Sequence, residues 1–259
     1  MRNFKFYIVL GSGLDHDGTV FLDADFDKLN KLVDDDGIMD LDPGHPDDMP
    51  ARVEEALTVL LGEKACKEVI SVLGGDLRKF FEREFFTKWH IPMYRKRPVY
   101  WLLQSAKKSY GIYLFHERLT GDSFFLIREK YVEPKISLEK NHLAELNGRL
   151  SGLPEGKGKR NLEKEIEKLE SFIDELTEFQ KNIRTITDMG YDPDINDGVI
   201  LNMAPLHEII PWSEPKKFWN ELEQGRYDWA HIAMKYWPER VKEKCKTDKS
   251  LMIAHGLEG

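Results

Sequence analysis

The first ninety residues begin with short apolar runs separated by polar turns and then change to helical spacing. Short apolar runs ended by glycine or aspartate are typical of strands, whereas apolar residues three and four positions apart are typical of helices. The Gly74-Gly75 pair interrupts the helical pattern. The expected strands are residues 4–10, 19–23 and 38–41, and the expected helices are residues 50–61, 64–73 and 76–89.

After Pro98 the pattern returns to short aromatic and β-branched runs, which predict three more strands. These are residues 99–103, 111–116 and 123–131, with polar turns between them. Strands and helices come in blocks and do not alternate regularly. We therefore expect an α+β fold with a small antiparallel sheet and packed helices.

From residue 134 to about residue 188 the chain has the composition of a long helical hairpin. Leu162, Ile166, Leu169, Ile173 and Leu176 follow a four-three spacing, which predicts an antiparallel coiled coil with its reversal at residues 152–158. The Glu- and Lys-rich outer positions are expected to be a solvated face. The expected segments are an α+β domain at residues 1–133, the coiled-coil hairpin at 134–190, and a helical, tryptophan-rich C-terminal segment at 191–259.

The net charge of −8 argues by itself against a nucleic-acid-binding protein. Residues 1–60 hold five cations and 14 acids, however, whereas residues 61–130 hold 14 cations and eight acids, so a basic region lies between acidic ones. The two cysteines have no motif around them, and neither an export signal nor a run of about eighteen apolar residues occurs. We therefore expect a cytoplasmic protein without membrane contact.

In the basic region, residues 78–131, lysines and arginines are interleaved with aromatic residues. Cations that neutralise phosphates, placed among rings that can stack, favour a nucleic-acid surface. The alternative is a core built from the rings with solvated cations around it, and we expect Phe80, Phe81 and Trp101 to belong to such a core. The candidate DNA-binding residues are therefore the cations Arg95, Lys96, Arg97, Lys107 and Lys108, extended by Lys79, Arg83 and Lys88.

Other motifs indicate no further chemistry in this chain. The turn Gly11-Ser12-Gly13 lacks the βαβ context of a nucleotide loop, and the acidic turn ending at Asp36 lacks the spacing of a calcium loop. The histidines show no paired ligand spacing, so we expect no catalytic residue, no metal site and no cofactor site in this chain.

Two long blocks resemble a known family. KRPVYWLLQSAKKSYGIYLFHERLTGDSFFLIREKYVEPKI, residues 96–136, resembles the KRPIYW segment of large adenine-N6 DNA methyltransferases of BREX (phage-growth-limitation) defence systems and of related single-chain restriction-modification enzymes. The block at residues 194–258 is similar to the far C-terminal region of the same enzymes. The residues before position 96 also resemble their counterparts there, in the turn at 14–18 and the DDDGI of 34–38.

The family's catalytic motif, Asn-Pro-Pro-Tyr/Phe, holds the flipped adenine, but this sequence contains neither a Pro-Pro nor an Asn-Pro pair. The resemblance therefore implies the non-catalytic, C-terminal DNA-recognition part of such an enzyme, whose full-length form uses S-adenosylmethionine. Double-stranded DNA and the catalytic domain are its implied partners. The alternative is a protein-interaction module that docks a catalytic domain or another subunit of the defence complex.

Overall fold

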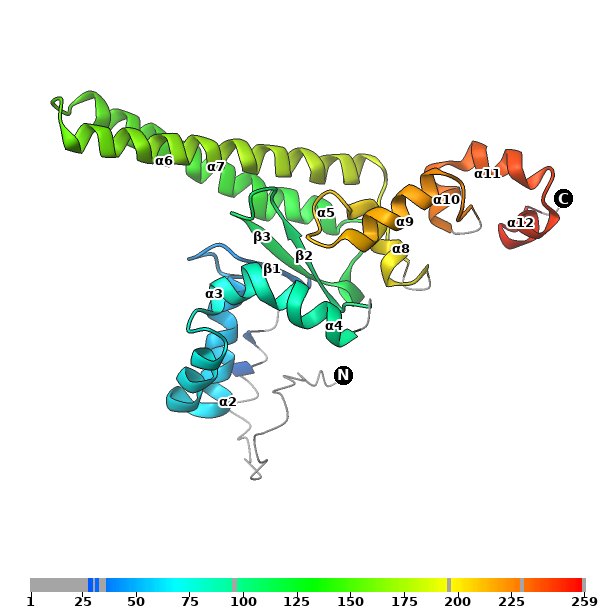
Figure 1. Cartoon of the computed structure of the whole chain (residues 1–259), viewed down its shortest axis with the longest axis horizontal. Helices are drawn as coiled ribbons and strands as arrows, with labels where there is room; N and C mark the ends of the chain where they lie inside the picture. Colours follow the sequence, from blue (N-terminus) through cyan, green and yellow to red (C-terminus); the bar gives the residue numbers. More distant parts are fainter. Residues whose placement is uncertain are drawn as a thin grey trace.

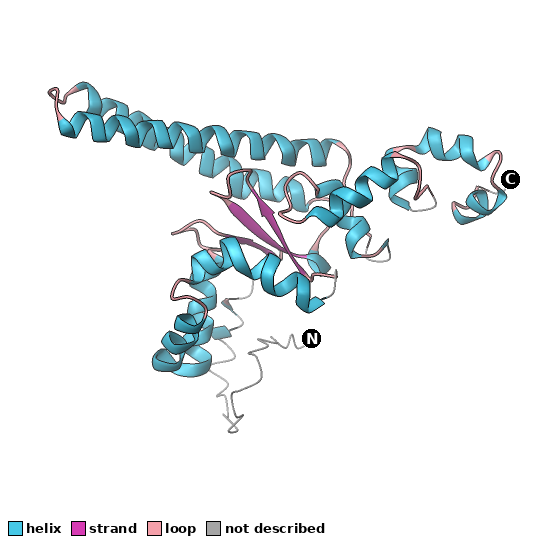
Figure 2. Cartoon of the chain, viewed as in Figure 1, coloured by secondary structure: helices cyan, strands magenta, loops and turns pink. Residues whose placement is uncertain are grey.

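The computed structural model describes residues 28–29, 31–32, 36–94, 97–194, 197–228 and 231–257. A small sheet lies at the centre, a long helical hairpin extends to one side of it, and a chain of short helices extends to the other side (Figure 1). Figure 2 shows that helices predominate around the three strands. The strands expected at residues 4–10 and 19–23 lie outside the described residues.

The sheet is antiparallel, with the order β1-β3-β2. Its strands are β1 (Ile38–Asp40), β2 (Tyr100–Gln104) and β3 (Gly111–Phe115), which confirms the expected strands at residues 38–41, 99–103 and 111–116. Leu114 pairs with Ile38 on one side and with Trp101 on the other. The backbone N–H of Gln104 donates to the carbonyl of Ile209 at 2.7 Å, so a C-terminal segment covers part of the outer edge of β2.

The helices before β2 form two units. The first is α2 (Met49–Val72), which begins with Asp48 as its cap and Pro50 in its first turn, and which bends at Gly62, where φ is 79°. After the Gly74-Gly75 break, a continuous helical run crosses one face of the sheet. This run consists of α3 (Leu77–Phe80), the π-helical η1 (Phe81–His90) and α4 (Ile91–Tyr94).

Side chains of β3 divide between the two faces of the sheet because successive residues of a strand point to opposite sides. Tyr113 contacts the rings of Phe81 and Phe85 on η1, and its hydroxyl donates to the carbonyl of Phe81 at 2.8 Å. Ile112 and Leu114 therefore face the other side, where they are fully buried. The sheet is thus a central layer with helices on both faces.

The strand expected at residues 123–131 is wrong, because this segment is helical. It contains α5 (Ser123–Leu126) and η3 (Ile127–Val132), which continue into the hairpin, after the short η2 (His116–Arg118). Phe124, Ile127 and Tyr131 are all buried, and they are three and four positions apart, which is the period of a helix face. A short aromatic run fits a strand or a buried helix equally well, and here the helical spacing decides.

The helical hairpin consists of α6 (Glu133–Ser151) and α7 (Lys157–Asp188), which lie side by side (Figure 1). The helices and their reversal agree with the expected hairpin, whereas its coiled-coil character stays a prediction. Near the reversal, a separate hydrophobic cluster joins the two helices. It contains Leu143, Leu146, Leu150, Leu162, Ile166 and Leu169.

The main hydrophobic core gathers residues from most of the chain. It runs from Ile38 in β1 through Phe179 and Ile183 in α7 to Ile210 near the C-terminal helices. The expected division at residues 133 and 190 stays a prediction. The C-terminal elements are α8 (Val199–Met203), η5 (Ala204–Leu206), α9 (Ser213–Glu223), α10 (His231–Tyr236), α11 (Pro238–Cys245) and α12 (Lys249–Ala254).

A second hydrophobic cluster holds these C-terminal helices together. Trp219 lies at its centre, with its ring 5.1 Å from that of Trp237 and stacked on His207 at 5.7 Å. Cys245 is buried here, and Cys66 is buried in α2, and both are free thiols. Within the described part of the chain, no helix combines the length and the apolar character that crossing a membrane requires.

Candidate nucleic-acid interface

The candidate cations are exposed and lie along the helical run and the β2–β3 hairpin. Lys79 lies on α3, Arg83 and Lys88 lie on η1, and Arg97 lies in the loop before β2. Lys107 and Lys108 form the turn between β2 and β3. Arg95 and Lys96 lie outside the described residues, so their part in the site stays a prediction.

His90 fixes the loop that leads from Arg97 into β2. Its Nε2 accepts hydrogen bonds from the backbone N–H groups of Val99 at 3.0 Å and Tyr100 at 2.9 Å. A nitrogen that accepts two hydrogen bonds carries no proton, so the ring is neutral with its proton on Nδ1. Burial agrees with this state, because it lowers the pKa of His90 to about 4. The ring also stacks on Phe85 at 5.2 Å.

Glu175 on α7 fixes the turn at the other end of β2. Its Oε1 accepts hydrogen bonds from the backbone N–H of Lys107 at 2.8 Å and of Ser109 at 3.3 Å. Although burial pushes the pKa of Glu175 upward, the hydrogen bonds from Ser105, Lys107 and Ser109 outweigh it and hold this pKa below its ordinary value. Between the two bonded residues, Lys108 has a φ of 64°, a left-handed conformation that the turn imposes.

The candidate cations do not gather in one cluster but lie toward the two ends of β2. Gln104 Nε2 donates to the carbonyl of Glu82 at 2.8 Å, and His90 lies against Tyr100, so η1 runs antiparallel to β2. Arg83 is therefore on the same side as the Lys107 turn, and Lys88 is near the Arg97 loop. A five-residue strand is about 17 Å long, so the two groups can contact different phosphates of one duplex.

The cations differ in how free their charges are. The Nζ of Lys88 forms an ion pair with Glu84 at 3.4 Å, and the Nζ of Lys107 donates to Ser171 on α7 at 2.6 Å. Burial raises the pKa of Glu82, which lies next to Arg83. Arg83, Arg97 and Lys108 form no ion pair with a residue in the described ranges. These three therefore offer their whole charge to a ligand.

The aromatic residues of the region divide into core and surface. Trp101 is fully buried, and its Nε1 donates to the carbonyl of Pro98 at 2.9 Å, which supports its expected place in the core. Phe80 and Phe81 are buried as expected. Trp89 and Met93, at the end of the helical run, are 51% and 53% exposed and form an apolar surface beside the Arg97 loop.

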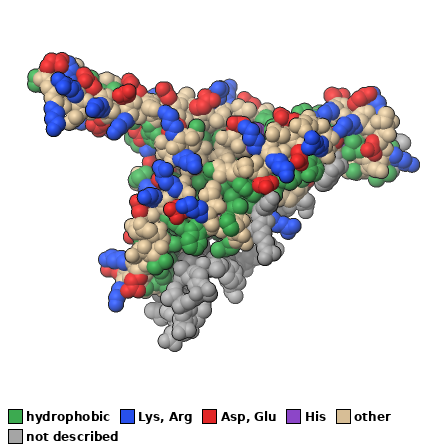
Figure 3. Space-filling view, viewed as in Figure 1, with side chains coloured by type: hydrophobic (Ala, Val, Ile, Leu, Met, Phe, Trp, Pro, Cys, Tyr) green, Lys and Arg blue, Asp and Glu red, His purple; other side chains and the backbone are tan. Residues whose placement is uncertain are grey.

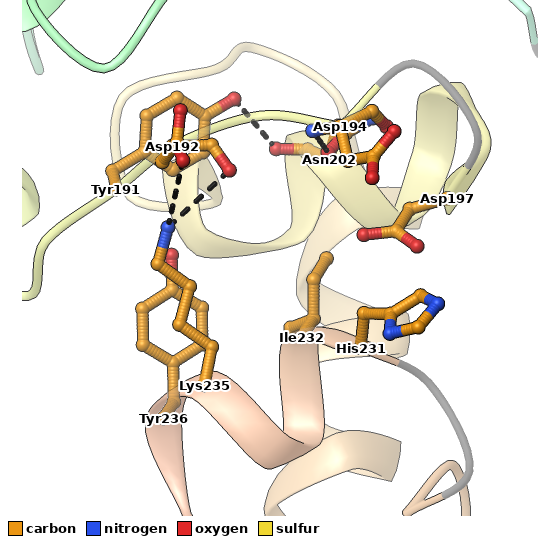
Figure 4. Close-up of a pocket in the computed structure, with 9 residues that line it drawn as sticks. All are labelled: Tyr191, Asp192, Asp194, Asp197, Asn202, His231, Ile232, Lys235 and Tyr236. Carbon is orange, nitrogen blue, oxygen red and sulfur yellow. Dashed lines mark hydrogen bonds and ion pairs between the residues drawn. The ribbon is translucent and has the colours of Figure 1, made fainter. Parts of the chain in front are cut away.

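A pocket of about 220 Å³ lies elsewhere, between the segment after α7 and helix α10 (Figure 4). Lys235 reaches the carbonyl of Asp192 at 3.3 Å, and Asn202 binds the backbone of Asp194. Asp197 and His231 point into the same space, and burial raises the pKa of Asp197 (Figure 4). The lining residues are Tyr191, Asp192, Asp194, Asp197, Asn202, His231, Ile232, Lys235 and Tyr236.

This pocket does not fit S-adenosylmethionine. None of its lining residues is a glycine, so it lacks the loop that lets a cofactor approach the backbone, and it is smaller than most ligand pockets. Groups of His, Cys, Asp and Glu arranged to hold a metal ion are absent from the described residues. The hydrogen bonds across the pocket join α8 and α10 to the end of α7, which is a structural role.

Sequence reasoning missed the two residues that position the candidate cations. His90 was expected to be an isolated histidine, and Glu175 was expected on the solvated face of the hairpin. A signal for Glu175 existed, because it lies three residues after Phe172 and four before Phe179, on the apolar face of α7. A carboxylate in an apolar stripe needs a buried partner, which here is the Lys107 turn.

No family model matches the chain, but two curated proteins are similar to it. One is the adenine-specific methyltransferase BrxX of Escherichia coli O9:H4 (strain HS), 27% identical over 198 residues with 69% of this chain covered. The other is the adenine-specific methyltransferase PglX of Lacticaseibacillus casei (strain Zhang), 27% identical over 190 residues with 69% of this chain covered.

The chain spans only 16% and 15% of the lengths of these two relatives. The resemblance to BREX-type adenine-specific methyltransferases that the sequence blocks indicated is confirmed at this level. The chain is thus similar to one region of such methyltransferases. The similarity does not by itself assign the relatives' activity to this chain.

Proposed function

We propose that this chain is a non-catalytic, DNA-recognition part of an adenine-specific DNA methyltransferase. The relatives are named as adenine-specific methyltransferases, and this chain corresponds to about a sixth of their length. In this proposal the rest of such an enzyme holds S-adenosylmethionine and the catalytic motif, and this chain contacts double-stranded DNA. A cytoplasmic location follows, because bacterial and phage DNA are methylated there.

The observation that carries the proposal is that exposed cations at both ends of β2 lie on segments whose backbone is fixed by hydrogen bonds to buried side chains. Lys107 and Lys108 lie in a turn whose backbone donates hydrogen bonds to Glu175. Arg97 lies in a loop whose backbone donates hydrogen bonds to His90. A cation that is already positioned loses less conformational entropy on contact with a phosphate than a mobile one. Solvated surface cations do not need such supports, so the supports favour a binding role over the alternative of a purely structural core.

The chemistry of the cations suggests a division of roles. Lysine is a point charge suited to phosphates, so Lys107 and Lys108 would position the duplex without reading its sequence. Arginine can also form a bidentate contact with the O6 and N7 atoms of guanine. Arg83 and Arg97 are therefore the candidates for base readout in the major groove.

A second candidate function is a docking module for the catalytic domain or for another subunit of a defence complex. The apolar surface at the end of the helical run favours it, because Trp89 and Met93 are more than half exposed and Tyr94 is 38% exposed. Exposed aromatic residues with a methionine are typical of protein interfaces. This surface lies beside the Arg97 loop at one end of β2, whereas the Lys107 turn lies at the other end, so the surface and the turn cations can be used at the same time.

The proposal is tested by measuring the affinity of the 259-residue chain for a labelled 24-base-pair duplex over a range of salt concentrations. We expect the logarithm of the affinity to fall linearly with the logarithm of the salt concentration. The double variant Lys107→Gln/Lys108→Gln should bind more weakly at every sequence and should lose about 0.9 unit of slope for each phosphate contact removed.

The matched control is Lys242→Gln/Lys246→Gln, which removes the same charge from two exposed lysines that pair with Glu239 and Glu243. The control should bind like the unchanged chain. Absence of duplex binding down to low salt, or equal losses in the two double variants, would contradict the proposal. If the chain does not bind the duplex, its binding to a catalytic domain should be measured. Such binding, abolished by Trp89→Ala, would identify the docking module instead.

A further inference from the structure

The α6–α7 hairpin projects beyond the main core as a self-supporting arm. On α7 the main core contains Leu176, Phe179, Ile183 and Ile186, and Phe172 packs against it, whereas residues 157–171 lie outside this core. These fifteen residues form an arm about 22 Å long at 1.5 Å per residue. The separate cluster around Leu146, Leu162 and Ile166 joins the two helices there. The end of the arm is therefore held at a defined position and not left as a loose loop.

Charge is unevenly distributed along this arm. Residues 149–164, which include the reversal, hold five cations and two acids, whereas residues 165–178 of α7 hold six acids and one lysine. Figure 3 shows lysine and arginine side chains at the far end of the arm. We use the term tip cations for four exposed residues of this end, Arg149, Lys157, Arg160 and Lys164.

The tip cations lack acidic partners, as do several other exposed cations of the described residues, but here four of them lie within sixteen positions of one hairpin end. Elsewhere Lys181, Lys216 and Lys246 each form an ion pair with a nearby glutamate. The tip cations form no ion pair with any residue in the described part of the chain, and Lys159 alone at this end pairs with Glu155. Their charges repel one another weakly in water, so a bound polyanion would lower the free energy of this arrangement.

The surface around the tip cations fits a phosphate backbone better than a protein. Protein interfaces have an apolar centre, whereas the apolar side chains exposed here are only Leu153, which is 40% exposed, and the neighbouring Pro154. The acidic stretch at residues 165–178 begins between the tip cations and the Lys107 turn. A duplex that reaches both would therefore be contacted at two separate places and not along the whole arm.

We propose that the tip cations form a second contact with the phosphate backbone of duplex DNA, separate from the one at the Lys107 turn. Ser171 touches Lys107, and Lys157 lies fourteen residues away on the same helix, so the two contacts are about 21 Å apart. This distance equals about six base-pair steps of 3.4 Å. The inference rests on the proposed function, and it gives the arm the role of fixing where the duplex lies relative to the sheet.

The first test removes the four charges by Arg149→Gln, Lys157→Gln, Arg160→Gln and Lys164→Gln in the 259-residue chain. Binding to a 24-base-pair duplex should weaken at least about tenfold at low salt, with the salt slope reduced by about 0.9 unit for each lost contact. The matched control has the same loss of charge at exposed, paired lysines. It carries Lys181→Gln, Lys216→Gln, Lys242→Gln and Lys246→Gln.

The second test places a photoreactive label at the tip. The native cysteines are buried, so the added thiol of Leu153→Cys can be labelled selectively, and Ile253→Cys in α12 provides an exposed control site. The label at residue 153 should crosslink to the duplex and the label at residue 253 should not. Equal crosslinking at the two sites, or none at residue 153 when the duplex is bound, would overturn the proposal.

Parallel measurement of the Lys107→Gln/Lys108→Gln variant separates this inference from the proposed function. Weak binding by the turn variant and unchanged binding by the tip variant would overturn the tip contact alone. Weak binding by the tip variant and unchanged binding by the turn variant would support the tip contact and contradict the proposed site at the turn. Absence of duplex binding by the unchanged chain would overturn both.

Discussion

The carboxylate of Glu175 accepts a hydrogen bond from the backbone N–H of Lys107 at 2.8 Å, across 68 positions of sequence. The contact joins the base of the hairpin arm to the turn between β2 and β3. The same oxygen accepts from Ser109, so one buried side chain determines the shape of the whole turn. The orientation of the arm and the position of two candidate cations therefore depend on the same residue.

Glu175→Gln should destabilise the protein by about 1–2 kcal/mol, because hydrogen bonds to a charged acceptor are stronger than those to a neutral one. The pKa of Glu175 is lowered in the folded state, so its contribution is present above its ordinary value of 4.5 and is lost as the pH falls through the lower folded value. Urea unfolding at pH 7 and at pH 3 measures this difference. Glu178→Gln, at an exposed residue of the same helix, should have little effect.

His90 should make the protein less stable in mild acid. Its pKa falls from 6.5 to about 4 on folding, so between these values the unfolded chain binds a proton that the folded chain does not. The free energy of unfolding should therefore decrease by about 3 kcal/mol from this residue as the pH falls from 7 to 4. In His90→Gln this part of the pH dependence should disappear, as measured by denaturant unfolding at several pH values. An unchanged pH dependence in the variant would contradict the buried neutral ring.

Asp40 should make the protein less stable as the pH rises. Burial and the nearby charge of Asp42 raise the pKa of Asp40 to about 6, and its Oδ1 is buried with no hydrogen-bond partner among the described residues. Its Oδ2 accepts from the hydroxyl of Tyr110 at 3.1 Å, an interaction that asparagine can keep. Stability from the neutral form is present below pH 3.8 and is lost as the pH rises through 6.

Asp40→Asn removes the loss of stability that ionisation of Asp40 causes. The variant should therefore gain about 3 kcal/mol relative to the unchanged protein between pH 4 and pH 8. Comparing the two proteins at each pH cancels the effect of His90, which both contain. A constant difference across this range would show that the carboxyl group ionises as it does in the unfolded chain.

Asp228 should be essential for the C-terminal helices. It is 3% exposed, and it forms ion pairs with Arg240, at 2.8 Å, and with Lys244. Asp228→Asn weakens the hydrogen bonds to two partly exposed cations, which should cost about 1–3 kcal/mol. Tryptophan fluorescence of the cluster around Trp219 during thermal unfolding would detect the loss. Glu243→Gln, at an exposed residue of α11, should unfold like the unchanged protein.

Much of the secondary structure could be predicted where residues strongly favour a strand, a helix or a turn. The strands around Trp101 and Tyr113, the break at Gly74-Gly75 and the hairpin reversal follow from short-range patterns in the sequence. The segment from Phe124 to Tyr131 was predicted wrongly, because aromatic residues favour strands in isolation while their packing here requires a helix. In that segment tertiary contacts outweigh local preference.

The candidate site could be predicted only in part. A lysine or arginine can be recognised directly in a sequence, so Lys107, Lys108 and Arg97 could be named as candidate DNA-binding residues from their charge alone. Their supports could not be found in this way, because His90 is nine residues from Val99 and Glu175 is 68 residues from Lys107. The tip cations were passed over because a charged hairpin is usually only solvated, and their lack of acidic partners is visible only in three dimensions.

The separate hydrophobic cluster of the arm makes its length independent of the rest of the fold. Adding or deleting about seven residues in both α6 and α7 would change the reach by about 10 Å while leaving the sheet and its core unaltered. If the tip cations contact DNA as proposed, the length of the hairpin sets how far from the sheet that contact lies. Relatives of this chain could therefore differ in this distance while they keep the same sheet.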